Sequence, residues 1–65
     1  MKVLIFRMIR GENWSDVLKE VNKILEELTD KYNNYDITVQ SQSQSEIILP
    51  GGERECTLFI TLKVG

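Results

Sequence analysis

Residues 14–32, WSDVLKEVNKILEELTDKY, decide the fold class of this chain. Apolar side chains recur there every three or four positions, which predicts an amphipathic α-helix with one apolar stripe. The stripe consists of Trp14, Val17, Leu18, Val21, Ile24, Leu25, Leu28 and Tyr32. Asn13 is a suitable N-cap residue, and Asn33-Asn34 can end the helix in the left-handed conformation.

Three further segments have the composition of β-strands. Residues 2–10 (KVLIFRMIR) are rich in β-branched and aromatic side chains, and both faces of this segment are largely apolar. Residues 36–45 (DITVQSQSQS) alternate strictly: Ile37 and Val39 share one face with the serines, and the glutamines on the other face suit an edge strand. Residues 55–64 (ECTLFITLKV) contain neither Gly nor Pro and have an apolar inward row, which favours a central strand.

The order strand, helix, strand, strand predicts a single α+β domain over residues 1–65. The helix returns the chain so that the first two strands run parallel. Inserting the third strand between them makes every neighbouring pair antiparallel. The predicted fold is therefore β-α-β-β, with a three-stranded antiparallel sheet in order 1-3-2 and one amphipathic helix on one face.

The pattern leaves two details open. The helix can cover either the row of Leu4, Phe6 and Met8 or the row of Val3, Ile5 and Ile9. In the hairpin, a tight turn at Pro50-Gly51 sets the three serines opposite the inward row, with Ser43 facing Ile60. A register shifted by four residues sets Ile37 near Leu62 and Val39 near Ile60 and makes residues 46–53 a loop. We favour this second register because it buries more apolar surface.

The composition gives no support for an enzyme or a metal site. The 65 residues include one cysteine and no histidine, so neither an internal disulfide nor a clustered zinc site can form. A nucleophile paired with a histidine base is also missing. Cys56 lies on the inward row of the third strand, where a buried structural thiol is expected. We predict a protein that is not an enzyme, with no catalytic residue, no metal ligand and no cofactor.

Charge and hydropathy bear on compartment and partners. The longest apolar run, residues 3–6, is too short to span a bilayer, and the start of the chain has no signal-peptide anatomy. One free cysteine without an export signal predicts a cytoplasmic protein. The net charge of −2 argues against nucleic-acid binding. Phe59 on an open sheet nevertheless keeps a single-stranded nucleic-acid platform as an alternative.

The sheet face away from the helix is the candidate interaction surface. Phe59 lies on its central strand, and Phe6 joins it if the helix covers the other row of the first strand. Exposed apolar strips of this kind mark interfaces. The candidate contact residues are Phe6 and Phe59 on the sheet and Ile47, Ile48 and Leu49 in the hairpin loop. We predict a non-catalytic module that self-associates, as a dimer or larger, through the open sheet face or an edge strand.

One resemblance covers nearly the whole chain. MKVLIF (residues 1–6), VNKIL (21–25), DITVQSQ (36–42) and the GGE turn (51–53) resemble a group of very small proteins from spore-forming bacteria. One member of that group is described as a sporulation protein. The resemblance implies a bacterial cytoplasmic protein of unknown biochemical role.

A second resemblance suggests an alternative function. NWSDVLKEV (residues 13–21) and the closing TLKVG (61–65) are similar to dodecins, flavin-storing proteins with the same element order that assemble as hollow dodecamers. Dodecins stack the flavin on a tryptophan at the start of the second strand. This chain has Tyr35 or Asp36 there, while Trp14 belongs to the helix stripe. The resemblance implies small-molecule (flavin) binding as the alternative, with Gln40 or Gln42 facing the ligand.

Overall fold

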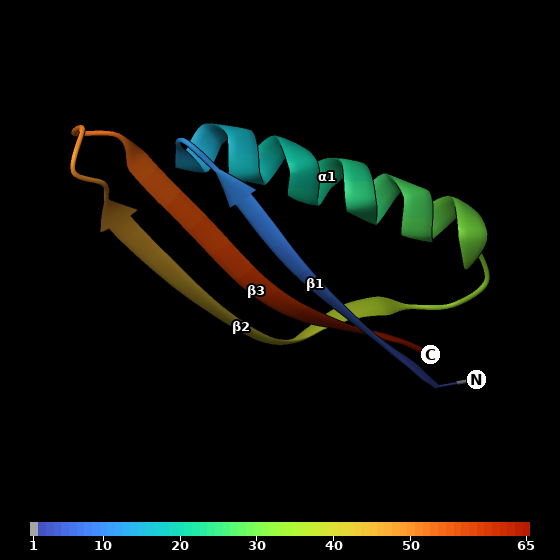
Figure 1. The fold of residues 1–65 in the computed structure, drawn as a ribbon. Coiled ribbons are helices and arrows are strands. Elements are labelled where there is room, and N and C mark those ends of the chain that lie inside the picture. The colour runs from blue at the N-terminus through green and yellow to red at the C-terminus, as the bar shows by residue number, and fades with distance from the viewer. Residues whose placement is uncertain (1) are drawn as a thin grey trace.

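A computed structural model describes residues 2–65 and has one helix packed on one face of a three-stranded antiparallel sheet (Figure 1). The sheet order is β1-β3-β2, as predicted. The elements are β1 (Val3–Gly11), α1 (Trp14–Lys31), β2 (Ile37–Ile48) and β3 (Arg54–Val64). The predicted α+β fold with the element order β-α-β-β is therefore confirmed.

Helix α1 begins as the sequence predicts and ends differently. The side chain of Asn13 accepts a hydrogen bond from the backbone N–H of Asp16 at 2.8 Å, which satisfies one of the free donors of the first turn. At the other end, the N–H of Tyr32 donates to the carbonyl of Leu28 at 2.8 Å. The predicted left-handed end at Asn33-Asn34 is wrong, since the only residues with positive φ in the described chain are glycines.

The core lies between α1 and the central strand. The whole inward row of β3 is buried, as predicted, and consists of Cys56, Leu58, Ile60, Leu62 and Val64. Val17 and Leu28 pack onto this row from the helix, and Ile9 joins it from β1. The helix contacts β1 and β3, the two strands that one helix of about 10 Å diameter can cover.

The pairing of β1 with β3 decides which row of β1 meets the helix. Ile5 pairs with Leu62 and Ile9 with Leu58, so these side chains lie on the core face. Leu4, Phe6 and Met8 point to the opposite face. The first and last strands also bring the two ends of the chain together, because Val3 pairs with Val64 (Figure 1).

The predicted register of the hairpin is wrong because β2 contains a bulge at Gln40. Ile37 pairs with Val64 and Val39 with Leu62, so both lie on the core face. The ladder then shifts by one residue between Val39 and Ser41. Because side chains alternate along a strand, the extra residue moves the serines to the opposite face, where Ser43 pairs with Phe59.

The predicted loop over residues 46–53 is also replaced by strand and a short turn. Strand β2 continues through Ile47 and Ile48, and the N–H of Leu49 donates to the carbonyl of Glu53 at 2.7 Å. The turn lies at Pro50-Gly51, but the left-handed residue is Gly52, with φ of 84°. A three-residue connection that ends in a left-handed glycine is a common hairpin geometry. Without a bulge, a hairpin with this three-residue turn would put Ile37 and Val39 on the face away from the helix. The extra residue at Gln40 keeps both side chains on the core side.

We predict that Asn13→Ala lowers the free energy of unfolding by about 1 kcal/mol, because the helix loses its N-cap acceptor. Urea unfolding followed by circular dichroism measures the change. Asn22→Ala is the matched control, since Asn22 is exposed within α1 and alanine has the higher helix propensity. An equal loss of stability in both variants would contradict the capping role.

Candidate functional site

The sheet face away from α1, here called the open face, is the candidate site. None of the elements between Lys2 and Gly65 covers it. The register assigns its residues: Leu4, Phe6, Met8 and Arg10 from β1; Glu55, Thr57, Phe59, Thr61 and Lys63 from β3; and Thr38, Ser41, Ser43, Ser45 and Ile47 from β2. The open face is therefore apolar on β1 and mostly polar on β2.

An apolar strip runs along the β1 side of the open face. Leu4, Phe6 and Met8 are 62%, 59% and 51% exposed, respectively. The ring of Phe6 stacks on that of Phe59, with centroids 6.5 Å apart and planes 29° apart. Phe6 therefore shares the open face with Phe59, which decides the question that the sequence left open for β1. We refer to Leu4, Phe6, Met8 and Phe59 as the apolar strip.

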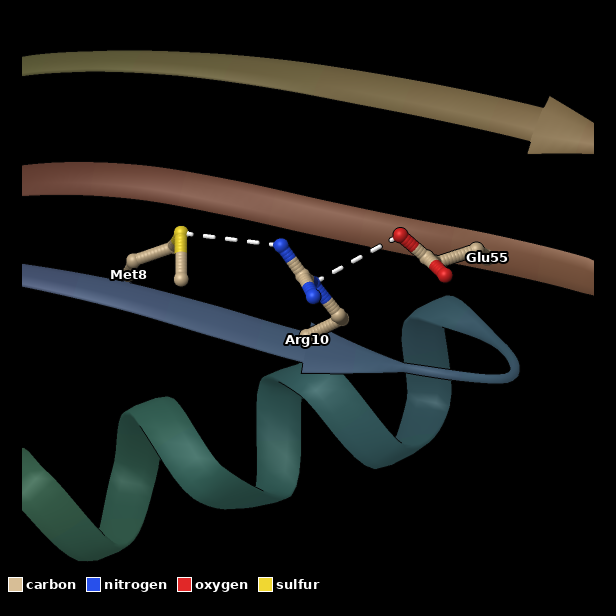
Figure 2. A network of polar contacts seen from close by, with 3 residues as sticks. All are labelled: Met8, Arg10 and Glu55. Carbon is tan, nitrogen blue, oxygen red and sulfur yellow. Dashed lines mark hydrogen bonds and ion pairs between the residues drawn. The ribbon is translucent and has the colours of Figure 1, made fainter.

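An ion pair between Arg10 and Glu55 lies at one end of this strip (Figure 2). Arg10 Nε lies 3.5 Å from Glu55 Oε1, and Arg10 Nη2 contacts Met8 Sδ at 3.9 Å. The guanidinium is therefore already engaged by a carboxylate from the neighbouring strand. Lys63, the other basic residue of the open face, is half-buried. This pairing leaves little free positive charge for a phosphate backbone.

The three residues predicted in the hairpin loop do not lie together. Ile47 lies on the open face opposite Glu55, while Ile48 points to the helix side and is 73% exposed. Leu49 is half-buried in the turn. Along β3, Glu55 is four residues from Phe59, a separation of about 13 Å. Ile47 is therefore an isolated apolar side chain and not part of the apolar strip.

Sequence reasoning identified β2 as an edge strand, as the sheet order confirms, but underestimated its length. All residues of β2 after Ile37 are exposed, and the helix leaves this strand uncovered. The alternation of serine and glutamine indicated an edge strand. The length of the edge became visible only when Glu46, Ile47 and Ile48 were placed in the strand and not in a loop.

Cys56 is a buried thiol and not a nucleophile in a pocket. Its side chain has no exposed area, and Sγ lies 3.8 Å from Glu46 Oε1, which accepts its hydrogen bond. Burial, reinforced by the nearby Glu46 carboxylate, raises the pKa of the Cys56 thiol above its ordinary value. Arg54 binds the same carboxylate oxygen at 3.4 Å. A neutral thiol in this position serves packing.

The residues that the dodecin resemblance brought forward lie apart in the structure. No group of three His, Cys, Asp or Glu side chains between residues 2 and 65 could hold a metal ion. Trp14 packs against the core, whereas Tyr35 is exposed. Gln40 lies at the bulge, and Gln42 pairs with Ile60 on the helix side of the exposed strand β2. These residues, which the dodecin resemblance brought forward, do not converge on one pocket.

Comparison with known proteins gives no relative: no family model, no curated protein and no solved structure matches the chain. In the part of the chain that the structure describes, no helix is long and apolar enough to cross a membrane. The functional proposal below therefore depends on the open face and its chemistry.

The raised pKa of Cys56 predicts a pH-dependent stability. The neutral thiol is favoured in the folded state, so its contribution is complete below the unfolded pKa of about 8.5 and is lost as the pH rises through the higher folded pKa. We expect the wild-type protein to lose more stability than Cys56→Ala between pH 8 and pH 10 in urea unfolding. Parallel pH profiles of the two proteins would contradict this.

Proposed function

We propose that this protein is a non-catalytic association module whose open face binds the open face of a second copy. The observation that carries the proposal is the apolar strip: Leu4, Phe6 and Met8 of β1 are more than half exposed, and Phe6 stacks on Phe59 of β3. Contiguous exposed apolar surface of this kind marks protein interfaces. Burying one such side chain stabilises an interface by about 1.5–3 kcal/mol.

The chain is more extended, and has more accessible surface, than a compact monomer of the same size. The radius of gyration is 13.7 Å, compared with about 11 Å for a compact chain of this length. The accessible surface is 4846 Å², compared with about 4,200 Å² for a monomeric protein of the same mass. The molecule measures 46 × 18 × 10 Å. A second layer on the open face would reduce this excess surface.

The chemistry of the open face is compatible with a copy of itself. Two sheets pack face to face about 10 Å apart with interdigitating side chains. The charged groups at one end, Arg10 and Glu55, already neutralise each other within one copy. The serines and Thr38 on the β2 side can remain at a solvated rim, where polar groups are usual.

The free thiol of Cys56 is suited to a reducing compartment, and we assign the protein to the cytoplasm.

We predict that Phe6→Ser weakens self-association at least tenfold in Kd, because each copy loses an aromatic side chain from the interface. Size-exclusion chromatography with light scattering over a dilution series measures the molar mass. The same run records the absorbance of the peak, since a coloured species would indicate a bound chromophore instead.

Leu18→Ser is the matched control. Leu18 is as exposed as Phe6 but lies on α1. We expect this variant to retain the wild-type molar mass. A monomeric wild-type protein, or a Phe6→Ser variant with unchanged mass, would refute association through the open face.

A further inference from the structure

The free edge of β2 is a second surface with its own chemistry. Strand β2 pairs with β3 on one side, and the sheet order leaves its other side without a strand. An unpaired edge presents a row of backbone donors and acceptors that can pair with another strand. From Ser41 to Ile48 the ladder to β3 is regular, so this segment is extended and free of bulges.

The usual protection of an edge strand is weak here. Natural edges are guarded by lysine, proline, inward charges, β-bulges or short length. The bulge of β2 lies at Gln40, outside the regular segment from Ser41 to Ile48. The twelve residues of β2 include no Lys, Arg or Pro and one charged residue, Glu46, which Arg54 already neutralises at 3.4 Å. The opposite edge is different, since β1 carries Arg7 and Arg10 and lies beside the helix. Only β2 offers a long, nearly uncharged edge.

The sequence of this edge is self-complementary. Residues 41–45 read Ser-Gln-Ser-Gln-Ser in both directions. When two antiparallel strands are related by a two-fold axis through the sheet, the residue on the axis faces its own copy, and the others pair symmetrically about it. With Ser43 on the axis, Ser41 lies across from Ser45 and Gln42 across from Gln44. Serine then meets serine on the open face, and glutamine amides can bond to each other on the helix side.

Charge and apolar exposure favour the same register. The two Glu46 carboxylates would lie six residues apart along the strands, about 20 Å, which is well beyond the screening length. On the helix side of the sheet, the exposed apolar side chains of β2 lie at its two ends, with Val39 at one end and Ile48 at the other. Antiparallel pairing brings the Val39 end of one copy next to the Ile48 end of its partner.

We propose that β2 pairs antiparallel with β2 of a second copy, with Ser43 on the two-fold axis, and forms a continuous six-stranded sheet. Edge pairing supplies further contact and keeps both apolar strips on one side of the extended sheet. This inference is independent of face-to-face association, and the two together close into a tetramer with two kinds of two-fold axis.

Engineered disulfides test the register. In the proposed dimer the two Ser43 Cα atoms lie about 4.5–5.5 Å apart, within the range of about 4.4–6.8 Å that a disulfide spans. Ser43→Cys should therefore form a covalent dimer under mild oxidation. Ser41→Cys is the matched control, because it lies on the same face while its own copy is about 14 Å away. We expect Ser41→Cys to cross-link at least tenfold more slowly and wild-type Cys56, which is buried, to stay free. Equal rates, or faster linkage through Ser41→Cys, would refute the register.

Charged pairs give a second test that needs no cysteine. Gln42→Lys with Gln44→Lys places like charges across the proposed interface and should weaken edge pairing at least tenfold. Gln42→Lys with Gln44→Glu places opposite charges across it and should retain pairing. Light scattering measures the mass of each double variant, with circular dichroism as the check of folding. Equal masses for both double variants would contradict the proposal.

Combining variants separates the two interfaces. With both interfaces in place, the wild-type protein is a tetramer. The Phe6→Ser variant and the variant with Gln42→Lys and Gln44→Lys are each dimers. The three changes together give a monomer. If Ser43→Cys still cross-links when combined with Phe6→Ser, edge pairing is supported, even if association through the open face is refuted. If the folded Ser43→Cys variant does not cross-link, edge pairing is overturned, even if association through the open face is confirmed.

Discussion

The structure depends on the burial of one strand beneath one helix. The inward row of β3 is removed from water largely by α1, including Val17 and Leu28, and both neighbouring strands pair with β3. Strand β1 also contacts the helix. Because one helix covers two strands, the third strand and the whole open face remain without intramolecular cover. The two surfaces proposed for association are thus consequences of building a three-stranded sheet with a single helix.

The fold class could be predicted because its signals are local. The apolar stripe of residues 14–32 and the uninterrupted pattern of β3 each specify an element and its buried side without reference to the rest of the chain. The face of β1 was not decidable, since both of its rows are apolar and only the pairing of Ile5 with Leu62 selects one. Phe59 was placed correctly on the open face for the same reason that β3 was central, whereas the placement of Phe6 required the pairing of β1 with β3.

The hairpin could not be derived from alternation alone. A strict period of two assigns Val39 and Ser43 to one face, but the bulge at Gln40 puts them on opposite faces. Bulges have no strong sequence signature, and this one is coupled to a three-residue turn that ends at Gly52. Ile47 and Ile48 were consequently predicted in a loop, and the edge strand was predicted shorter than it is.

The pairing of Val3 with Val64 has a consequence for how the protein is made. Strand β1 is synthesised before the other elements of this domain, yet every one of its ladder partners lies in β3. The helix and the β2–β3 hairpin involve short loops, whereas docking β1 requires closing nearly the whole chain, which slows folding. Until β3 is available, both apolar rows of β1 stay exposed to water. The nascent chain therefore carries an apolar strand without its sheet partner until β3 has been synthesised.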